Sequence, residues 1–322
     1  MHIQKINTTI KELTSQTKKP KIILGLSGGP DSVFLFHILN ALKKENKIEL
    51  IAAHLNHGWR NESDKDEKFC QKLCSENNIK FLSTHANQLK INFKQNGSKE
   101  EFGRKLRQHF FVKSLKKENA NFIALAHHLQ DQQETFFWRI IRGTSLSGLG
   151  CMKEKNGFYI RPLLKINKKD ILEYLTKNEF EYKEDKSNLS DNFLRNKIRK
   201  YVLTALEKSD PRFNKKFQDT LSNLQEEEKF LTKLTQKNFQ ETFTQQKDCL
   251  SGNLKTFLDN DLVIQKRLII QWLCNEKVKF ENSSSLIKEI IRFLDSPRGG
   301  AHKIYPNLII RKKEKIFWLE KI

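Results

Sequence analysis

Hydrophobic and polar positions follow two alternating patterns over the first two hundred residues. Short apolar runs rich in β-branched residues predict strands, and they alternate with segments of helical periodicity. The predicted strands cover residues 21–26, 48–53, 79–84 and 121–126, and the predicted helices cover residues 31–43, 62–77, 99–117 and 131–141. Strands that alternate with helices predict βαβ units and a parallel, Rossmann-like sheet covered on both faces. Ligands of such sheets bind at the carboxyl ends of the strands.

The pattern changes after Arg199. Residues 205–246 are rich in Gln, Lys and Glu with helical spacing, and two strands are expected near the end, at 303–310 and 315–319. Residues 209–212 (SDPR) provide turn-forming side chains between the two regions. We therefore expect an α/β catalytic domain at residues 1–208. A smaller, mainly helical C-terminal domain with a short terminal β element should occupy residues 209–322.

Apolar residues at the start of the chain predict a short amphipathic helix, because Ile3, Ile6, Ile10 and Leu13 fall at helical spacing. This segment lacks the apolar centre of a signal peptide. No run in the chain approaches the roughly 18 apolar residues that a membrane span needs. We expect a cytoplasmic protein.

The charge favours a polyanionic partner without deciding the matter. The chain has 59 Lys and Arg against 38 Asp and Glu, a formal net charge of +21. Clustered on one face, such charge attracts nucleic acid; spread evenly, it only keeps the surface soluble. The five cysteines include no CxxC pair, so neither a zinc knuckle nor a redox relay is indicated. Cys70 and Cys74, four residues apart on an expected helix, fit core thiols.

The first predicted strand runs directly into a glycine-rich loop made of Ser27, Gly28, Gly29, Pro30, Asp31 and Ser32. Glycines let the backbone approach a ligand closely, and consecutive amides before a helix N-terminus bind anions. A carboxylate fits among phosphates when Mg²⁺ lies between them. The loop matches neither the Walker pattern nor GxGxxG. The alternative is an ordinary glycine turn with Asp31 as a helix cap.

This hexapeptide resembles the PP-loop of N-type ATP pyrophosphatases. The resemblance implies that the first domain is an N-type PP-loop domain and that all six residues bind ATP. It also implies that ATP is cleaved to AMP and pyrophosphate through an adenylated intermediate, with Mg²⁺ as the metal.

Further segments resemble motifs of one PP-loop family. Residues 54–60 (HLNHGWR) are similar to HxNHxxR, which makes His54 and Asn56 candidates for the ATP site. Residues 100–107 (EEFGRKLR) resemble ExxARxxR, and Arg104 and Arg107 lie on one helical face, where two arginines can bind phosphates. Each segment has a structural alternative: loop or cap histidines in the first, a solvated charge stripe in the second.

Two more motifs follow. Residues 127–135 (HHLQDQQET) resemble HHxxDxxET, so that Asp131 shares a Mg²⁺ site with Asp31 or only caps its helix. Residues 142–150 (RGTSLSGLG) resemble an RGTGxxGL loop, with RPL at 161–163 beyond it. The chain departs from the family at Gln130, often Asp, at Gly103, usually Ala, and at Ser145, usually Gly.

The last motif joins an acidic loop to a basic helix. Residues 184–188 and 193–199 resemble EDxSNxxxxFxRNxIR. The alternative is an acidic surface loop that leads into a basic helix and has no role in catalysis or binding. The basic side chains that could contact tRNA phosphates are Arg195, Lys197, Arg199 and Lys200.

Taken together, these segments resemble the motifs of the tRNA(Ile)-lysidine synthetases. The resemblance implies a reaction at the wobble cytidine of tRNA(Ile) with the anticodon CAU. The C2 oxygen attacks the α-phosphate of ATP, and the ε-amine of free L-lysine then displaces AMP to give lysidine. The expected catalytic residues are Asp31 and Asp131 at the metal, Arg104 and Arg195 at the α-phosphate and adenylate, and His127 as the base. The partners are this tRNA and lysine, and the sequence leaves open whether the chain is a monomer or a homodimer.

Three other functions remain open from the sequence. A tRNA thiolase of the same superfamily usually needs the paired cysteines that this chain lacks. A small-molecule PP-loop synthetase would not need a basic second domain. A non-catalytic tRNA-binding protein with a relic ATP site would not keep Ser27, Asp31, Ser32 and Asp131.

Overall fold

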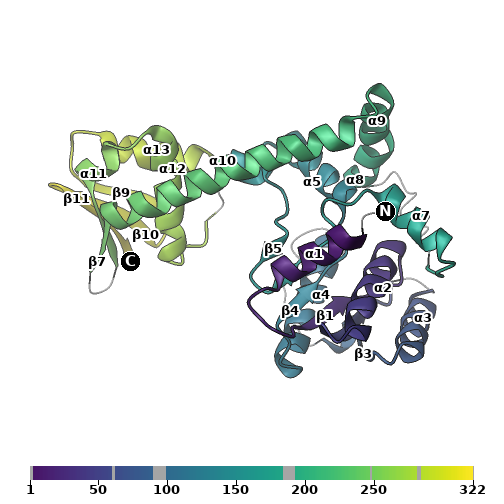
Figure 1. The fold of residues 1–322 in the computed structure, drawn as a ribbon. Coiled ribbons are helices and arrows are strands. Elements are labelled where there is room, and N and C mark those ends of the chain that lie inside the picture. Colours follow the sequence, from purple (N-terminus) through teal and green to yellow (C-terminus); the bar gives the residue numbers. More distant parts are fainter. Residues whose placement is uncertain are drawn as a thin grey trace. The chain divides into compact units, whose positions relative to one another are not determined.

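The computed structural model describes residues 3–59, 62–89, 99–183, 193–246, 249–280 and 284–321. The chain divides into two compact units, Met1–Ser222 and Asn223–Ile322, and Figure 1 labels many of their helices and strands. No helix among the described residues is both long and apolar enough to cross a lipid bilayer.

The N-terminal unit is built on a six-stranded sheet in the order β3-β2-β1-β4-β6-β5. Its strands are β1 (Lys21–Gly25), β2 (Glu49–Asn56), β3 (Lys80–His85), β4 (Phe122–Ala124), β5 (Lys155–Asn156) and β6 (Tyr159–Ile160). Neighbouring strands are parallel except for the antiparallel pair β5 and β6 at one edge. The strand order reverses between β1 and β4, and such a switch point opens a ligand crevice at the carboxyl ends of the strands.

Helices precede, connect and follow these strands. They are α1 (Ile3–Leu13), α2 (Pro30–Lys44), α3 (Ser63–Glu76), the 3₁₀ turn η1 (Ala86–Gln88), α4 (Lys99–Lys117), α5 (Leu129–Arg142), α6 (Leu146–Leu149), α7 (Lys168–Lys177), α8 (Leu194–Lys197), the π-helical η3 (Ile198–Leu203) and α9 (Thr204–Ser209). Every strand and helix predicted for the first 150 residues is present, with ends within a few residues of the prediction.

Both faces of the sheet are buried, because side chains of β1 alternate between two cores. Ile22 and Leu24 belong to a core with residues of α1, α2 and α7, whereas Ile23 belongs to a second core with Phe110 and Phe111 of α4. A strand period of two sends neighbouring side chains to opposite faces. The predicted parallel sheet with helices on both sides is therefore confirmed.

The division between the units falls inside α10 (Phe213–Thr242), at Ser222. The predicted turn at 209–212 does separate α9 from α10, where Asp210 Oδ1 accepts the backbone N–H of Arg212 at 2.8 Å. The first turns of α10 nevertheless pack into the N-terminal unit, because Phe217 and Leu221 form a small core with Leu129. This contact explains why the compact units divide later than the expected boundary at 208/209.

The C-terminal unit combines helices with an antiparallel sheet in the order β7-β8-β11-β10-β9. Its elements after α10 are β7 (Phe243–Gln245), β8 (Leu250–Asn253), α11 (Leu254–Leu258), α12 (Leu262–Asn275), α13 (Ser284–Asp295), β9 (Gly300–Tyr305), β10 (Leu308–Lys313) and β11 (Ile316–Lys321). Aromatic rings fill its core: Trp272 and Phe257 both meet Phe317 edge-on, at centroid distances of 5.1 and 5.5 Å.

The prediction of one strand over residues 303–310 is wrong. Two strands, β9 and β10, form a hairpin there, in which Leu308 pairs with Tyr305 across Pro306 and Asn307. The alternation of apolar residues continues through this short turn, so that the pattern reads as one strand. The strands β7 and β8 were not predicted, because they lie at and beyond the end of a long polar helix.

Candidate active site

The glycine-rich loop joins the carboxyl end of β1 to the N-terminus of α2. Gly28 has a φ of 85°, a conformation that favours glycine. The two serines close the loop: Ser32 Oγ lies 3.1 Å from Ser27 Oγ and donates to the Gly29 carbonyl at 2.9 Å. The residue at the N-cap of α2 is Gly29, which has no side chain to cap the helix. The first N–H groups of the helix therefore remain for an anion, as the sequence predicts.

Two carboxylates and a histidine meet beside this loop. Asp31, in the first turn of α2, and Asp131, in the first turn of α5, each place Oδ2 near His128 Nε2, at 3.5 and 3.6 Å. Lys168, from the start of α7, donates to Asp31 Oδ1 at 2.5 Å. The two loops that supply the carboxylates follow β1 and β4, the strands on either side of the switch point. The predicted meeting of Asp31 and Asp131 thus has a geometric basis in this unit.

The electrostatics of this cluster favour charged side chains. Burial raises the pKa of Asp31, but the imidazole of His128 and the amine of Lys168 outweigh burial and lower it below its ordinary value. Burial lowers the pKa of His128, but the carboxylates of Asp131 and Asp31 outweigh it and raise the value. Each charged partner stabilises the charged form of the other.

The donor set fits a hard cation such as Mg²⁺, which prefers carboxylate oxygens together with phosphate oxygens. Asp31 and Asp131 come from different helices and approach the same nitrogen, His128 Nε2. Asp131 also has the capping role considered from the sequence, because its Oδ2 accepts the backbone N–H of His128 at 2.8 Å. The side chain of Asp131 therefore caps α5 and at the same time lies beside the histidine that Asp31 approaches.

His127 differs from its neighbour in charge. Burial lowers the pKa of His127 to about 4; Asp131 opposes this shift, and the charges of Arg161 and Arg107 reinforce it. Among the described residues, no group forms a hydrogen bond with the buried Nδ1 of His127. The imidazole is neutral at pH 7 and can accept a proton.

The predicted arginines lie in different surroundings. Arg104 and Arg107 are exposed on α4, whereas Arg195 on α8 is half-buried. Arg199 donates from Nε to Glu134 Oε1 at 2.6 Å, and the Glu134 side chain is only 4% exposed. This ion pair links α5 to η3, so Arg199 stabilises the packing of the two helices behind the site. Of the basic residues expected at tRNA, Lys197 and Lys200 are exposed.

His54 and Asn56 are buried at the end of β2 and shape the loop that follows it. His54 Nδ1 lies 2.9 Å from the Leu26 carbonyl oxygen, which precedes the glycine-rich loop. Burial lowers the pKa of His54 despite this contact. Asn56 Nδ2 donates to Asp64 Oδ1 and Glu67 Oε2, each at 2.8 Å. Neither side chain is exposed to a ligand directly.

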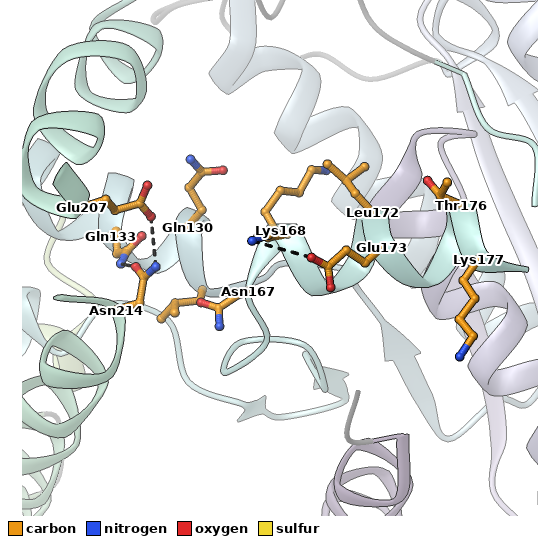
Figure 2. Close-up of a pocket in the computed structure, with 12 residues that line it drawn as sticks. Gln130, Gln133, Asn167, Lys168, Leu172, Glu173, Thr176, Lys177, Glu207 and Asn214 are labelled. Atoms are coloured by element: carbon orange, nitrogen blue, oxygen red, sulfur yellow. Dashed lines mark hydrogen bonds and ion pairs between the residues drawn. The ribbon is translucent and has the colours of Figure 1, made fainter. Parts of the chain in front are cut away.

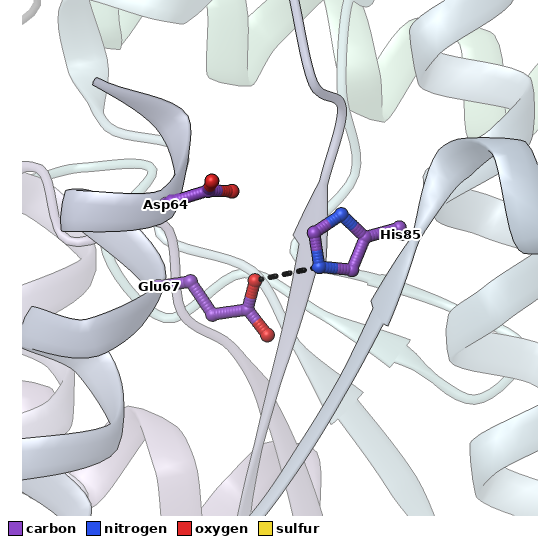
Figure 3. Close-up of side chains that lie close together, drawn as sticks. All are labelled: Asp64, Glu67 and His85. Carbon is purple, nitrogen blue, oxygen red and sulfur yellow. Dashed lines mark ion pairs between the residues drawn. The ribbon is translucent and has the colours of Figure 1, made fainter. Parts of the chain in front are cut away.

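The carboxylates held by Asn56 belong to a second polar cluster, shown in Figure 3. Asp64 and Glu67 on α3 lie near His85 at the end of β3, and His85 Nε2 is 3.3 Å from Glu67 Oε2. Their ligand atoms lie within 4.8 Å of one another. The cluster links β2, α3 and β3 through hydrogen bonds and fixes the end of the sheet next to the glycine-rich loop.

A cavity of about 690 Å³ lies beside Lys168 (Figure 2). It is lined by the start of α5, by the face of α7 from Asn167 to Lys177, and by Glu207 and Asn214. Gln133 donates to Asn214 Oδ1 at 2.6 Å, and Asn214 donates to Glu207 Oε1 at 3.0 Å. None of the six loop residues lines the cavity, but Lys168 extends from its wall to Asp31. The volume is typical of a site for a small ligand.

Comparison with known proteins assigns the chain to a family. The PP-loop domain family matches residues 2–206. The tRNA(Ile)-lysidine synthase of Petrotoga mobilis is 33% identical over 316 residues, which make up 97% of this chain and 96% of that protein. The chain belongs to the tRNA(Ile)-lysidine synthase family. The tRNA(Ile)-lysidine synthase of Bacillus subtilis is 34% identical over 309 residues, 92% of this chain and 62% of that protein.

Among solved structures, the U34-tRNA thiolase NcsA from Methanococcus maripaludis with its [4Fe-4S] cluster shares the fold. It is 24% identical to this lysidine synthase homologue, with a TM-score of 0.58 over 69% of this chain and 78% of that chain. At this identity the similarity supports the fold alone. The family assignment confirms the resemblance that the motifs predicted.

The fold brings to the site side chains to which the motifs assigned no role, including Arg161 of the RPL segment. Lys168 lies in an unremarkable NKKD segment, 137 residues from Asp31, and only the packing of α7 places its amine there. Arg161 follows β6, at the same edge of the sheet, and its buried Nε has no hydrogen-bond partner among the described residues. In the sequence, His128 could have been found as a member of the site because it stands next to His127 at the end of β4. Residues 184–188 and Arg60 lie outside the described residues.

Proposed function

We propose that this lysidine synthase homologue joins free L-lysine to C2 of the wobble cytidine of tRNA(Ile) with the anticodon CAU, with cleavage of ATP to AMP and pyrophosphate. One observation carries the proposal: Asp31, His128, Asp131 and Lys168 meet beside the uncapped N-terminus of α2. The PP-loop domain implies ATP. Mg²⁺, tRNA(Ile) and lysine are parts of the proposal.

In the first step the C2 oxygen of the cytidine forms a bond to the α-phosphorus of ATP, and the bond from that phosphorus to the bridging oxygen breaks. The electron pair leaves with pyrophosphate. The free N–H groups at the start of α2 stabilise the charge on this leaving group. Asp31 and Asp131 would hold Mg²⁺, which neutralises phosphate charge when bound. Arg104 and Arg195 are the proposed cations for the α-phosphate and the adenylate.

In the second step the ε-amine of lysine attacks C2, and AMP leaves with the former C2 oxygen. An ammonium group with a reference pKa of about 10.4 must first lose a proton, which costs roughly 4–5 kcal/mol at pH 7. We assign this proton to His127, whose pKa of about 4 keeps the ring neutral and whose buried Nδ1 has no hydrogen-bond partner among the described residues. A neutral ring with this pKa is a weak base, so we propose that the carboxylate of Asp131, which raises the pKa of His127 against the effect of burial, stabilises the ring as it takes the proton.

The basic helix after residue 192 is the proposed contact for the tRNA near the site. Lys197 and Lys200 are exposed there, together with Phe193 and Tyr201, which are 48% and 55% exposed. Exposed aromatic rings beside cations bind single-stranded nucleic acid by stacking and charge. We propose that the C-terminal unit binds another part of the tRNA, in keeping with the net charge of +21.

The thiolase alternative finds no support in the cysteines. Cys70 lies close to the glycine-rich loop: its Sγ is 3.3 Å from the position that a Cβ on Gly28 would take. Burial raises the pKa of the Cys70 and Cys74 thiols well above the ordinary value, so neither is a ready nucleophile. Both pack in the core, as the sequence predicts.

The test follows AMP release from ATP. Purified protein with MgCl₂ and ATP should form AMP and pyrophosphate only when tRNA(Ile) with a CAU anticodon is added. AMP formation without any tRNA would contradict the proposal and favour a small-molecule synthetase. A transcript with a uridine at the wobble position is the matched control and should not support AMP formation.

A further inference from the structure

Amide side chains line the cavity beside Lys168 on three elements of the fold (Figure 2). The start of α5 provides Gln130 and Gln133, the residue before α7 is Asn167, and the start of α10 provides Asn214. Each amide offers donors and an acceptor, so the cavity suits a ligand that has both kinds of group along its edge. Nucleobases have such edges, and asparagine and glutamine bind them through paired hydrogen bonds.

Two of these amides are held by neighbours and two are open to a ligand. Gln133 donates to Asn214, which donates to Glu207, and this chain fixes one wall of the cavity. The half-buried amides of Gln130 and Asn167 form no hydrogen bond with any residue that the structure describes. Asn167 stands at the N-cap of α7, where an asparagine side chain ordinarily accepts a helix N–H, yet it makes no capping bond. Both open amides are therefore available to a ligand.

The charged groups of the cavity favour an anion at the start of α7. Three cations of this helix line it, Lys168, Lys169 and Lys177. Lys169 Nζ is 3.8 Å from Glu173 Oε1 in an exposed pair, which is a weak interaction, and Lys177 has no ion pair within the described part of the chain. Gln130 is neutral at a position where the resembling motif often has Asp, so no carboxylate at this position repels an anion. A phosphate group fits this end of the cavity.

The cavity adjoins the proposed catalytic site. Lys168 lines the cavity, and its amine donates to Asp31. The helix α5, which forms another wall, packs against η3 of the proposed tRNA contact through the ion pair of Glu134 and Arg199. An RNA strand with its target base at Asp31 therefore has the cavity beside it. A volume of about 690 Å³ is in the range of sites for ligands of nucleotide size and is larger than a free amino acid requires.

We propose that this cavity binds one nucleotide of the single-stranded anticodon loop, next to the reacting base, with its phosphate at the start of α7 and its base against Gln130 and Asn167. This inference rests on the proposed function, which brings the anticodon loop to Asp31. Bases of an unpaired loop can be splayed out and bound at their edges. Gln130 and Asn167 are positioning residues, because they bind RNA and do not touch the reacting atoms.

The test adds a negative charge to the cavity without a change of shape, by Asn167→Asp and by Gln130→Glu. Aspartate caps a helix as well as asparagine does, and its charge is favourable at a helix N-terminus. Asn167→Asp should therefore melt at or above the temperature of the unsubstituted chain. The matched control is Asn119→Asp, the same change in an exposed loop before β4, at the opposite edge of the sheet. Titration calorimetry measures binding of a tRNA(Ile) transcript with a CAU anticodon and of ATP, and turnover gives the KM for lysine.

We expect each cavity variant to bind the transcript about 10-fold more weakly than the unsubstituted chain. Binding of ATP and the KM for lysine should not change, and Asn119→Asp should bind the transcript normally. Unchanged binding of the transcript by both cavity variants, or an equal loss in the control, would overturn the inference. A lower KM for lysine with unchanged tRNA binding would also overturn it, because an added carboxylate attracts an ammonium group and the cavity would then hold lysine.

Turnover of the unsubstituted chain separates this inference from the proposed function. If that chain makes lysidine while both cavity variants bind the transcript normally, only the nucleotide site fails. If it makes no lysidine while the cavity variants lose affinity for the transcript, the proposed function fails and the cavity remains a site for RNA.

Discussion

Lys168 Nζ lies 2.5 Å from Asp31 Oδ1, although 137 residues separate them in the sequence. The contact joins α7 to the first turn of α2 and places a positive charge beside the carboxylate of the glycine-rich loop. Asp31 is thereby held in one position between Lys168 and His128 before a nucleotide binds. Such fixed charge is the form in which protein electrostatics assists a reaction most effectively.

The first prediction concerns Asp31 itself. Asp31→Asn removes the negative charge but keeps the shape, so we expect turnover to fall by at least about 100-fold, while binding of tRNA persists. Single-turnover kinetics and a filter-binding titration measure the two effects. Asp219→Asn, an exposed residue on α10, is the matched control and should behave like the unsubstituted chain. Full turnover by Asp31→Asn would mean that the carboxylate has no part in catalysis.

The second prediction concerns pH. The partners of His128 raise its folded-state pKa above the unfolded value of 6.5. Its contribution to stability is therefore complete below pH 6.5 and is lost as the pH rises through the folded value. We expect the difference in melting temperature between the unsubstituted chain and His128→Asn to shrink as the pH rises above 6.5. A difference that stays constant or grows over this range would show that His128 is not stabilised as a cation.

The third prediction separates the roles of two neighbouring basic residues. Arg199→Met leaves the buried carboxylate of Glu134 without its partner. Loss of one member of a fully buried pair costs about 3–5 kcal/mol, and we expect about 2–3 kcal/mol because part of Arg199 remains in water. Lys197→Met, at an exposed position, should leave stability unchanged and weaken tRNA binding. Denaturant unfolding measures the first effect; an unaltered midpoint for Arg199→Met would contradict the bracing role.

The fourth prediction lies in the C-terminal unit. Lys312 is only 4% exposed, and its Nζ donates to the carbonyl oxygens of Phe293, Leu294 and Ser296 at the end of α13. The residue therefore caps a helix and is not free to bind phosphate. Lys312→Met should destabilise the unit by about 1–3 kcal/mol, because buried acceptors lose their donor. Hydrogen exchange in α13 reports the change, and the exposed Lys313→Met should leave that exchange as it is.

Sequence patterns predict an element of this fold where the interactions that form it are local. The first 150 residues could be assigned because strand and helix periods are local, and because Gly28 and Asp31 stand in a short motif between a strand and a helix. The local pattern gave a wrong prediction where it is ambiguous. Apolar residues continue to alternate across Pro306 and Asn307, so the strands β9 and β10 were predicted as one strand. Strands as short as β5 and β6 contain too few residues to show a period.

The motifs predict which loops meet at the carboxyl edge of the sheet, and the roles of their residues stay predictions. Asp31 and Asp131 were placed together because parallel strands end at one edge of a sheet. Lys168 could not be found, since nothing in the local sequence distinguishes a lysine that reaches a distant carboxylate from one in water. The same limit applies to Arg199, whose charge suggested a contact with tRNA and whose Nε is bound to Glu134.

The central claim is transfer of lysine to a base. The protein is incubated with MgCl₂, ATP, radiolabelled lysine and a tRNA(Ile) transcript with a CAU anticodon, and the tRNA is then treated with mild alkali. We expect the label to survive, because a carbon–nitrogen bond to C2 is stable where an aminoacyl ester hydrolyses, and to migrate as a modified cytidine after nuclease digestion. ATP cleavage that depends on tRNA but leaves no alkali-stable lysine on it would contradict the account.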